Sequence, residues 1–384
     1  MKYYLIAGEP SGDSLGGRLM QALKQKDPNA EFIGIGGDNM QEQGLKSLFD
    51  ISELAVMGIA EVIPSIPRIL KRIKQTVAEI ERTKPDAVIT IDSWSFCARI
   101  HKKIRTLKLG IPQIHYVAPQ VWAWKKRRAR TMYKYIDLLL TLFPNEPKYF
   151  TPYHLDTVFV GHPVIESAIV NNSSNGLFKK EHNIEENKRI MLILPGSRHN
   201  EVQRLLPDFM EAAKIVQRKF TDIVFVIPTV STVAKRVKQM VRNYALPVII
   251  VEGQDERSKA FCDSSVAVAA SGTVALELAI VNVPHIIAYK VPKLTEILAR
   301  CFLHIKFVNL TNLLLNRLVV PELLQQECNP KNIASYVIKF LTDAGEYQRQ
   351  KQGFEEARIM LGFGRQTPSE NAAQAIINKI NALK

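Results

Sequence analysis

The sequence predicts an α/β protein built from two doubly wound parallel sheets that face a cleft. Short apolar segments alternate with amphipathic helical patterns along most of the chain, which is the order of a parallel sheet covered by helices. Polar, glycine-containing loops follow several of these segments, where ligands bind in such sheets. The chain has 384 residues, enough for two domains, and a hydrophilic stretch at 171–176 separates two series of strands.

The composition is typical of a globular protein with an excess of positive charge. The formal net charge of +14 predicts an anionic partner, which could be nucleic acid, an anionic membrane face or a phosphorylated substrate. The four cysteines have no disulfide or metal-site spacing, so we expect reduced thiols in a cytosolic protein. The apolar start of the chain breaks at Gly8 and Pro10, as a first strand does and a signal peptide does not. No apolar run is long enough for a spanning helix, so we expect any membrane contact to be peripheral.

The first predicted strand, residues 3–7, leads into a glycine-rich turn at residues 8–13. Its glycines do not fit the G-x-G-x-x-G pattern of a dinucleotide site, and Glu9 and Asp13 would repel a pyrophosphate. We therefore expect no nicotinamide cofactor. The two acids could instead bind sugar hydroxyls or a reacting hydroxyl group.

Residues 54–74 combine aliphatic side chains with a dense row of cations. Such a stretch can lie in a membrane interface, with Lys and Arg on lipid phosphates. Periodicity alone favours an amphipathic helix packed on the core, but Pro64 and Pro67 argue against a regular core helix over residues 62–67. The residues of this candidate membrane patch are Val62, Ile63, Ile66, Arg68, Ile69, Leu70 and Arg72.

The predicted strand at 86–91 puts Asp92 at its carboxyl end. A carboxylate in that place can act as a general base, although a cap on the following helix explains it equally well. Further on, Trp122 and Trp124 precede a basic run at 125–130. That combination suits nucleic acid, a glycolipid phosphate or a solvated helix face.

The second half of the chain repeats the order of strand, loop and helix. Arg198 follows a Gly-Ser pair after the strand that starts at Ile190, and it suits a diphosphate leaving group. A later strand ends in a loop with Ser271, Gly272 and Thr273 at a helix start, which predicts a phosphate site. One turn into that helix, Glu277 could accept hydrogen bonds from a ribose, although an ordinary helix cap with a solvated Glu explains the motif equally well.

An amide-rich segment follows the second series of strands. Residues 307–317 interrupt an apolar run with amides that include Asn312. Buried amides need hydrogen-bond partners, and we expect a bound ligand to supply them.

Through several co-linear motifs the chain resembles the lipid-A-disaccharide synthase family. Its members are inverting glycosyltransferases with the GT-B fold of two Rossmann-like domains. The resemblance covers nearly the whole chain. It is carried by residues 7–13, 54–58, 91–92, 116–124, 194–198, 270–273 and 312–314.

The resemblance implies a reaction in lipid A (lipopolysaccharide) biosynthesis. UDP-2,3-diacylglucosamine would give its sugar to the 6-hydroxyl of 2,3-diacylglucosamine 1-phosphate, forming a β-1,6-linked disaccharide 1-phosphate and UDP. It further implies a cytoplasmic enzyme attached peripherally to the anionic cytoplasmic face of the bacterial inner membrane. No cofactor and no metal are expected, and a homodimer is left open.

The family's motifs also suggest roles for individual residues. Asp92 falls on the family's essential aspartate and is the favoured base, with Glu9 as second choice. The predicted UDP-binding residues are Arg198, Ser271, Gly272, Thr273, Glu277 and Asn312. The chain departs from its relatives at Ser95, where they commonly have Asp, and at Thr311, where they tend to have Pro.

We expect residues 1–165 to form the acceptor and membrane-side domain and residues 166–344 the UDP-sugar domain. Residues 345–384 are expected to be helices that pack back across both. Two alternatives remain: a UDP-sugar 2-epimerase on the same fold, and a non-catalytic basic protein that binds nucleic acid. The second alternative predicts steeply salt-dependent binding, but no recognised nucleic-acid module is present, so we expect no nucleic-acid partner.

Overall fold

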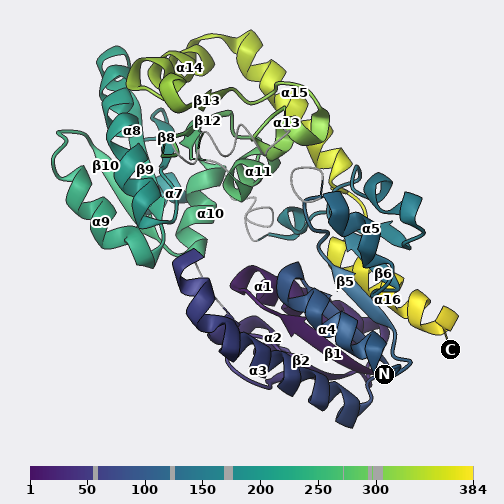
Figure 1. Ribbon diagram of the computed structural model, residues 1–384. Helices are drawn as coiled ribbons and strands as arrows, with labels where there is room; N and C mark the ends of the chain where they lie inside the picture. The colour runs from purple at the N-terminus through teal and green to yellow at the C-terminus, as the bar shows by residue number, and fades with distance from the viewer. Residues whose placement is uncertain are drawn as a thin grey trace. The chain divides into compact units, whose positions relative to one another are not determined.

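The computed structural model describes residues 1–54, 59–121, 126–167, 176–270, 272–292, 296 and 306–383, without the side chains of residues 59–65, 126 and 273. Its contacts divide the chain into two compact units (Figure 1). The first unit contains Met1–Pro163 and Gly364–Lys384, and the second contains Val164–Phe363. The first division thus lies two residues before the expected boundary at 165. The second division lies at 363, within the segment 345–384 that the sequence treated as one piece.

The first unit is built on a seven-stranded sheet in which all strand pairs are parallel. The spatial order is β3-β2-β1-β4-β5-β6-β7. The strands are β1 (Lys2–Ala7), β2 (Glu31–Ile35), β3 (Lys46–Ser47), β4 (Ala87–Ile91), β5 (Gln113–Tyr116), β6 (Leu138–Thr141) and β7 (Thr157–Phe159). From β1 the chain adds β2 and then β3 towards one edge of the sheet, and it then returns to place β4 on the other side of β1. The order therefore reverses between β1 and β4, and ligands bind at such a reversal.

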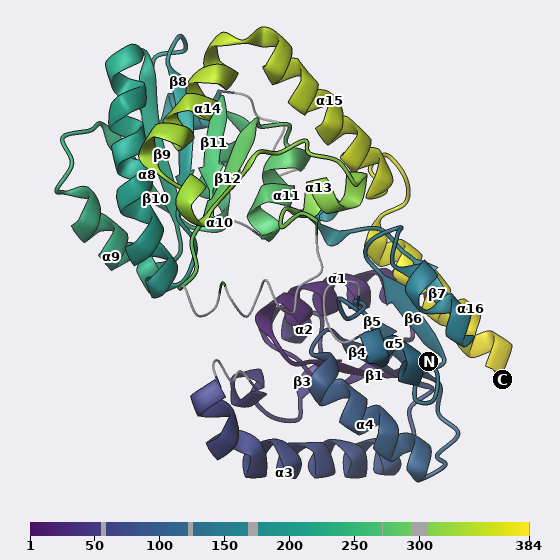
Figure 2. The same ribbon diagram turned by 45° about the horizontal axis from the view of Figure 1, so that its top comes forward.

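Helices cover both faces of this sheet, as Figure 2 shows. They are α1 (Pro10–Lys26), α2 (Asp38–Glu42), α3 (Ile59–Thr83), α4 (Trp94–Thr106), α5 (Ala129–Met132) and α16 (Pro368–Leu383). Alternate residues of β1 point to opposite faces, so Tyr3 and Leu5 pack with α1 and α16, whereas Tyr4 and Ile6 pack with α3 and α4. Because both faces are covered, β1 is an unbroken apolar run and does not alternate with polar residues.

The second unit has a six-stranded sheet of parallel pairs in the order β10-β9-β8-β11-β12-β13. Its strands are β8 (Arg189–Leu194), β9 (Ile223–Thr229), β10 (Val248–Glu252), β11 (Val266–Ala269), β12 (His285–Tyr289) and β13 (Glu322–Leu324). Its helices are α7 (Leu177–Glu181), α8 (His199–Lys219), α9 (Ser231–Val241), α10 (Gln254–Cys262), α11 (Thr273–Ile280), α13 (Leu310–Leu315), α14 (Pro330–Thr342) and α15 (Ala344–Met360). Here the order reverses between β8 and β11. The two doubly wound, Rossmann-like parallel sheets confirm the predicted fold class.

The last two helices belong to different units. In α15, Phe354 packs into the core of the second unit. In α16, Ala372, Ile376 and Ile380 pack into the core of the first unit. The apolar stripes of these two helices therefore fix which sheet each one covers.

Helix α3 runs through both of its prolines. The sequence argued against a regular core helix over 62–67. The expected break in the helix is wrong, because the backbone is helical from Ile59 to Thr83, but Ile66 is exposed and does not belong to the core. Pro64 and Pro67 remove only two main-chain donors, and both lie in the first half of the 25-residue helix. Its later turns are anchored by Ile73 and Ile80, which are buried in the core. In the described part of the chain, no helix is both long enough and apolar enough to cross a membrane.

Candidate active site

The first candidate site lies where the strand order reverses between β1 and β4. The loop after β1 carries Gly8 and Glu9, and the turn after β4 carries Asp92 and Ser93. The two loops approach closely, since a Cβ atom on Gly8 would lie 2.9 Å from Ser93 Oγ. Glycine at this position therefore allows the two loops to meet.

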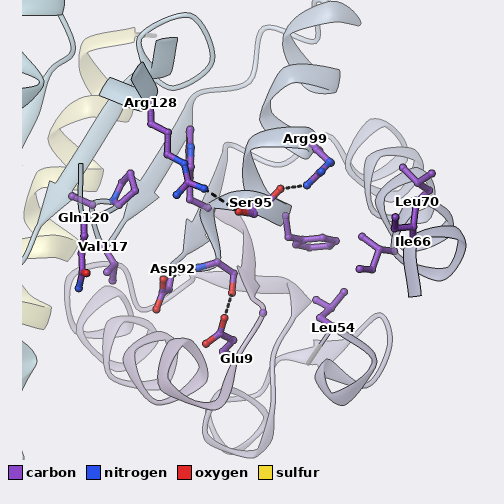
Figure 3. Close-up of a pocket in the computed structure, with 17 residues that line it drawn as sticks. Glu9, Leu54, Ile66, Leu70, Asp92, Ser95, Arg99, Val117, Gln120 and Arg128 are labelled. Carbon is purple, nitrogen blue, oxygen red and sulfur yellow. Dashed lines mark hydrogen bonds between the residues drawn. The ribbon is translucent and has the colours of Figure 1, made fainter. Parts of the chain in front are cut away.

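Ser93 connects the two predicted catalytic acids. Its hydroxyl donates a hydrogen bond to Glu9 Oε1 at 3.0 Å, and its backbone N–H donates to Asp92 Oδ1 at 2.8 Å (Figure 3). Asp92 and Ser93 both have left-handed backbone conformations, with φ of +55° and +43°. Non-glycine residues adopt this region rarely, at a cost of about 1 kcal/mol each, so packing must hold the turn.

The environment of Asp92 suits a base. Burial raises the pKa of its carboxyl group, the Ser93 N–H lowers that pKa, and the negative charge of Glu9 raises it, with a net shift upward. A carboxylate with a raised pKa accepts a proton more readily, which is what general-base catalysis near neutral pH requires.

The other acid of the first loop has a structural role. The Asp13 carboxylate accepts hydrogen bonds from the backbone N–H groups of Gly37 at 2.7 Å, Asn39 at 3.0 Å and Met40 at 3.1 Å. It also accepts one from the Asn39 side chain at 2.8 Å. Asp13 therefore satisfies the free N–H groups at the start of α2. Of the two acids, only Glu9 lines the pocket.

A buried polar network lies below the Asp92 turn. Thr90 Oγ1 is hydrogen-bonded to His101 Nε2 at 2.8 Å and to His115 Nδ1 at 2.6 Å, and His101 Nδ1 to Gln113 Oε1 at 2.8 Å. Burial lowers the pKa of His101 to about 4 and that of His115 well below its usual value, so both rings are neutral near pH 7. The Trp94 ring lies 4.7 Å from the His115 ring, measured between centroids. This network supports the junction of β4 and α4, from which Asp92 projects.

These loops open into a pocket of about 810 Å³, within the usual range for small-molecule sites. Acids, cations and apolar side chains line it, together with neutral polar residues such as Ser95 and Gln120 (Figure 3). The acids are Glu9 and Asp92. The cations are Arg99 and Arg128. The apolar side chains include Leu54, Ile66, Ile69, Leu70 and Phe96.

Val117, at the pocket edge, has an unusual backbone conformation for its residue type. Its φ is +80°, a region that β-branched residues rarely occupy, and its N–H donates to the Leu140 carbonyl at 3.0 Å. Such strain costs on the order of 1–3 kcal/mol and concentrates at functional sites.

The predicted aliphatic patch on α3 is exposed only in part. Ile66 and Leu70 are 45% and 47% exposed, and Arg68 is exposed beside them. Ile69 is half-buried and lines the pocket. Arg72 does not fit the prediction of a cation facing lipid, because its Nε donates to Glu53 Oε2 at 2.8 Å and its guanidinium lies 4.6 Å from the Phe49 ring centroid. The side chains of Val62 and Ile63, like residues 55–58 and 122–125 of the family motifs, lie outside what the structure describes.

The second candidate site is a pocket of about 410 Å³ where β8 and β11 adjoin. The structure brings Arg198, Gly272 and Glu277 together along its wall. Gly272, at φ +81°, begins α11 in a conformation that favours glycine. Ser271 and the side chain of Thr273 lie outside the described residues.

An arginine that the sequence did not single out also lines this pocket. Arg257 on α10 forms an ion pair with Glu277. Burial raises the pKa of the Glu277 carboxyl, and the charge and hydrogen bond of Arg257 lower it. Arg198 is more open, with 71% of its side chain exposed and its Nη1 2.9 Å from Glu201 Oε1. On another wall of the pocket, the buried Thr229 hydroxyl has no hydrogen-bond partner among the described residues.

Asn312 is placed differently from the prediction. Its side chain is fully buried. Its Nδ2 donates to the Val320 carbonyl at 2.7 Å and to Glu322 Oε1 at 2.8 Å. Its Oδ1 accepts hydrogen bonds from the N–H groups of Val319 and Val320 at 2.8 Å each. These four bonds use the full capacity of the amide. The prediction that a bound ligand supplies its partners is therefore wrong, and Asn312 instead ties α13 to β13.

Comparison with known proteins relates this chain to one family. A family model described as lipid-A-disaccharide synthetase matches residues 3–376. The lipid-A-disaccharide synthase of Paramagnetospirillum magneticum is 47% identical over 383 residues, covering 99% of this chain and 98% of that one.

Solved structures share the fold at low identity. A UDP-GlcNAc 2-epimerase from Neisseria meningitidis, solved with UDP-GlcNAc bound, has a TM-score of 0.64 at 14% identity and covers 100% of both chains. MurG from Acinetobacter baumannii has a TM-score of 0.54 at 14% identity and covers 99% of both chains. At such identities the likeness concerns the fold alone, so the epimerase neighbours do not favour an epimerase function.

Proposed function

This chain belongs to the lipid-A-disaccharide synthase family and is a UDP-sugar-dependent glycosyltransferase, and we propose a specific donor and acceptor for it. The donor is UDP-2,3-diacylglucosamine, and the acceptor is 2,3-diacylglucosamine 1-phosphate. The product is the β-1,6-linked disaccharide 1-phosphate. The observation that carries this proposal is the first-unit pocket, which joins a pair of carboxylates, two cations and an aliphatic wall.

In this proposal the second unit binds the UDP moiety. The backbone and hydroxyl groups of Ser271, Gly272 and Thr273 bind phosphate at the start of α11, where free N–H groups favour anions. Arg198 and Arg257 neutralise the diphosphate as it leaves. Glu277 accepts hydrogen bonds from the ribose hydroxyls when Arg257 turns to the phosphates.

The first unit binds the acceptor and supplies the base. Asp92 takes the proton from the 6-hydroxyl, and the oxygen forms a bond to the anomeric carbon of the donor. The bond from that carbon to the UDP oxygen breaks with its electron pair on UDP, and attack from the opposite face inverts the anomeric centre. The raised pKa of Asp92, caused first by its burial, supports it in this role. Glu9 holds Ser93 and, through it, the turn that carries Asp92.

The enzyme acts, in this proposal, at the anionic cytoplasmic face of the inner membrane. Exposed aliphatic side chains at Ile66 and Leu70 lie beside the exposed cation Arg68, and the whole chain carries a formal net charge of +14. Replacing Ile66 and Leu70 with Ser is expected to reduce binding to vesicles containing anionic lipid. Leu107→Ser is the matched control, since Leu107 is 46% exposed on another helix end and does not line the pocket. Equal vesicle binding by both variants and the wild type would count against the membrane role.

A UDP-release assay with defined lipids tests the proposed reaction. We expect UDP to appear only when the diacyl donor and the phosphorylated diacyl acceptor are both present, with one disaccharide formed for each UDP. UDP release that does not depend on the acceptor would contradict the proposal.

A further inference from the structure

Two arginines meet at Ser95 in the first-unit pocket. Arg99, one turn further along α4, donates to the Ser95 carbonyl oxygen. Arg128 comes from the turn before α5, and its Nη2 donates to Ser95 Oγ at 3.3 Å. The two side chains reach Ser95 from different directions, as Figure 3 shows. Segments about thirty residues apart in the sequence thus bring two guanidinium groups to one residue.

Neither guanidinium is neutralised by an acid within the described residues. Several other arginines of the protein do have carboxylate partners, among them Arg72, Arg105 and Arg189 with Glu53, Asp137 and Asp222. Among the residues that the structure describes, Arg99 and Arg128 instead bond to neutral atoms of Ser95. Their remaining N–H groups and the Ser95 hydroxyl face a solvent-accessible pocket and offer several donors with two positive charges. Such a set matches a phosphate group, which arginine binds through paired charge-assisted hydrogen bonds.

The pocket has three chemical regions, and the proposed acceptor has three matching groups on one sugar ring. The reacting 6-hydroxyl corresponds to Asp92, and the acyl chains correspond to the aliphatic wall that includes Ile66 and Leu70. The remaining region holds the two arginines, and the remaining group is the 1-phosphate. Asp92 and Ser95 are three residues apart across the start of α4, so one sugar can address both.

We propose that Arg99, Arg128 and the Ser95 hydroxyl bind the 1-phosphate of the acceptor and make the enzyme selective for a phosphorylated sugar. This inference rests on the proposed function. Holding the phosphate at Ser95 and the acyl chains on the aliphatic wall leaves the 6-hydroxyl as the group directed at Asp92. The arginines are therefore positioning and specificity residues and take no part in proton transfer.

The test compares two acceptors that differ only in the phosphate: 2,3-diacylglucosamine 1-phosphate and the corresponding methyl glycoside. The variants are Arg99→Gln and Arg128→Gln. Matched controls are Lys103→Gln on α4 and Arg127→Gln beside Arg128, both exposed cations that do not line the pocket. Turnover of the methyl glycoside, which needs Asp92 in the same unit, reports that the first unit of each variant is folded.

We expect each pocket variant to raise KM for the phosphorylated acceptor by about 10- to 100-fold, the usual effect of losing a charge-assisted hydrogen bond. Kinetics with the methyl glycoside and KM for the donor are expected to stay unchanged, so the preference for phosphate is lost. The control variants keep that preference. Pocket variants that keep the wild-type preference for the phosphorylated acceptor would overturn the proposal.

Binding without turnover separates this inference from the reaction itself. Calorimetry of the full chain with a short-chain diacylglucosamine 1-phosphate, in the absence of donor, is expected to show tight binding that either pocket variant weakens by at least about tenfold. If that holds while no disaccharide forms, the phosphate site stands and the proposed reaction fails. Equal affinity of wild type and pocket variants would overturn the phosphate site even if disaccharide forms.

Discussion

Replacing Asp92 with Asn removes the proposed base while keeping the shape of the side chain. The amide oxygen of Asn can still accept the hydrogen bond from the Ser93 N–H, so the left-handed turn should survive. Loss of general-base catalysis typically costs about 10²- to 10⁴-fold in rate. At about 1.4 kcal/mol for each factor of ten, that is roughly 3–5 kcal/mol added to the barrier. We expect kcat to fall by this factor with the KM for both substrates nearly unchanged.

The pH dependence of kcat provides a second reading of the same site. Since Asp92 must be ionised to act as a base, the rate falls as the pH drops through its pKa. Burial, followed by the negative charge of Glu9, raises that pKa. Glu9→Gln removes the charge while the amide oxygen can still accept from Ser93 Oγ, so the acid limb of the profile should move to lower pH with only a modest loss of rate.

The two variants together decide which acid is the base. If Glu9 were the base, Glu9→Gln would show the large loss and Asp92→Asn the small one. An Asp92→Asn enzyme with kcat within about threefold of the wild type, and with unchanged affinity for UDP, would refute the assignment of Asp92.

Three further predictions concern UDP binding and stability. Asn312→Leu leaves the buried N–H of Val320 without a partner, at about 1–3 kcal/mol, and also removes the partner of the partly buried N–H of Val319. Urea denaturation should therefore show a loss of stability, while the folded protein keeps its UDP affinity. A much weaker affinity for UDP in the folded variant would restore a ligand role for Asn312. Arg257→Gln should weaken UDP binding by about 10- to 100-fold in calorimetry, whereas the exposed control Lys235→Gln should leave it unchanged. Equal affinities of the Arg257→Gln variant and the wild type for UDP would show that Arg257 does not bind UDP. Burial lowers the pKa of His101 and of His285 to about 4 from 6.5, so the unfolded chain binds more protons between these values. The contribution of these two rings to the free energy of unfolding should therefore be constant above pH 6.5. It should fall by roughly 3 kcal/mol for each ring as the pH drops towards 4. A flat free energy of unfolding over that interval would contradict their burial as neutral rings.

The meeting of Glu9 and Asp92 could be predicted from the sequence. Both follow apolar runs that had to be buried strands, and the carboxyl ends of parallel strands meet at one edge of a sheet. The same reasoning applies to Arg198 and Gly272, which follow β8 and β11 and line one pocket. What the sequence could not supply was Ser93 as the link, because a left-handed pair of residues after a strand has no clear pattern in composition.

Contacts between distant segments explain the predictions that failed. The sequence around a buried amide does not reveal whether a ligand or the chain itself supplies its hydrogen-bond partners. The partners of Asn312 come from residues 319–322, beyond its own helix. For the basic tract around Arg128 the sequence left nucleic acid, a glycolipid phosphate and a solvated helix face open, and it did not indicate the contact of Arg128 with Ser95 on α4. The prolines of α3 do not interrupt its backbone, because the packing of the later helical turns in the core outweighs the low helix propensity of proline.

The central claim is that this chain joins two acylated sugars through the 6-hydroxyl of one of them. The most direct measurement is NMR of the product formed from a donor labelled with ¹³C at its anomeric carbon. The account predicts one new glycosidic bond to that hydroxyl, with the anomeric configuration inverted from the donor and one UDP released for each bond. A labelled sugar that stays attached to UDP with altered configuration at carbon 2, or one released to water with no bond to the acceptor, would contradict it.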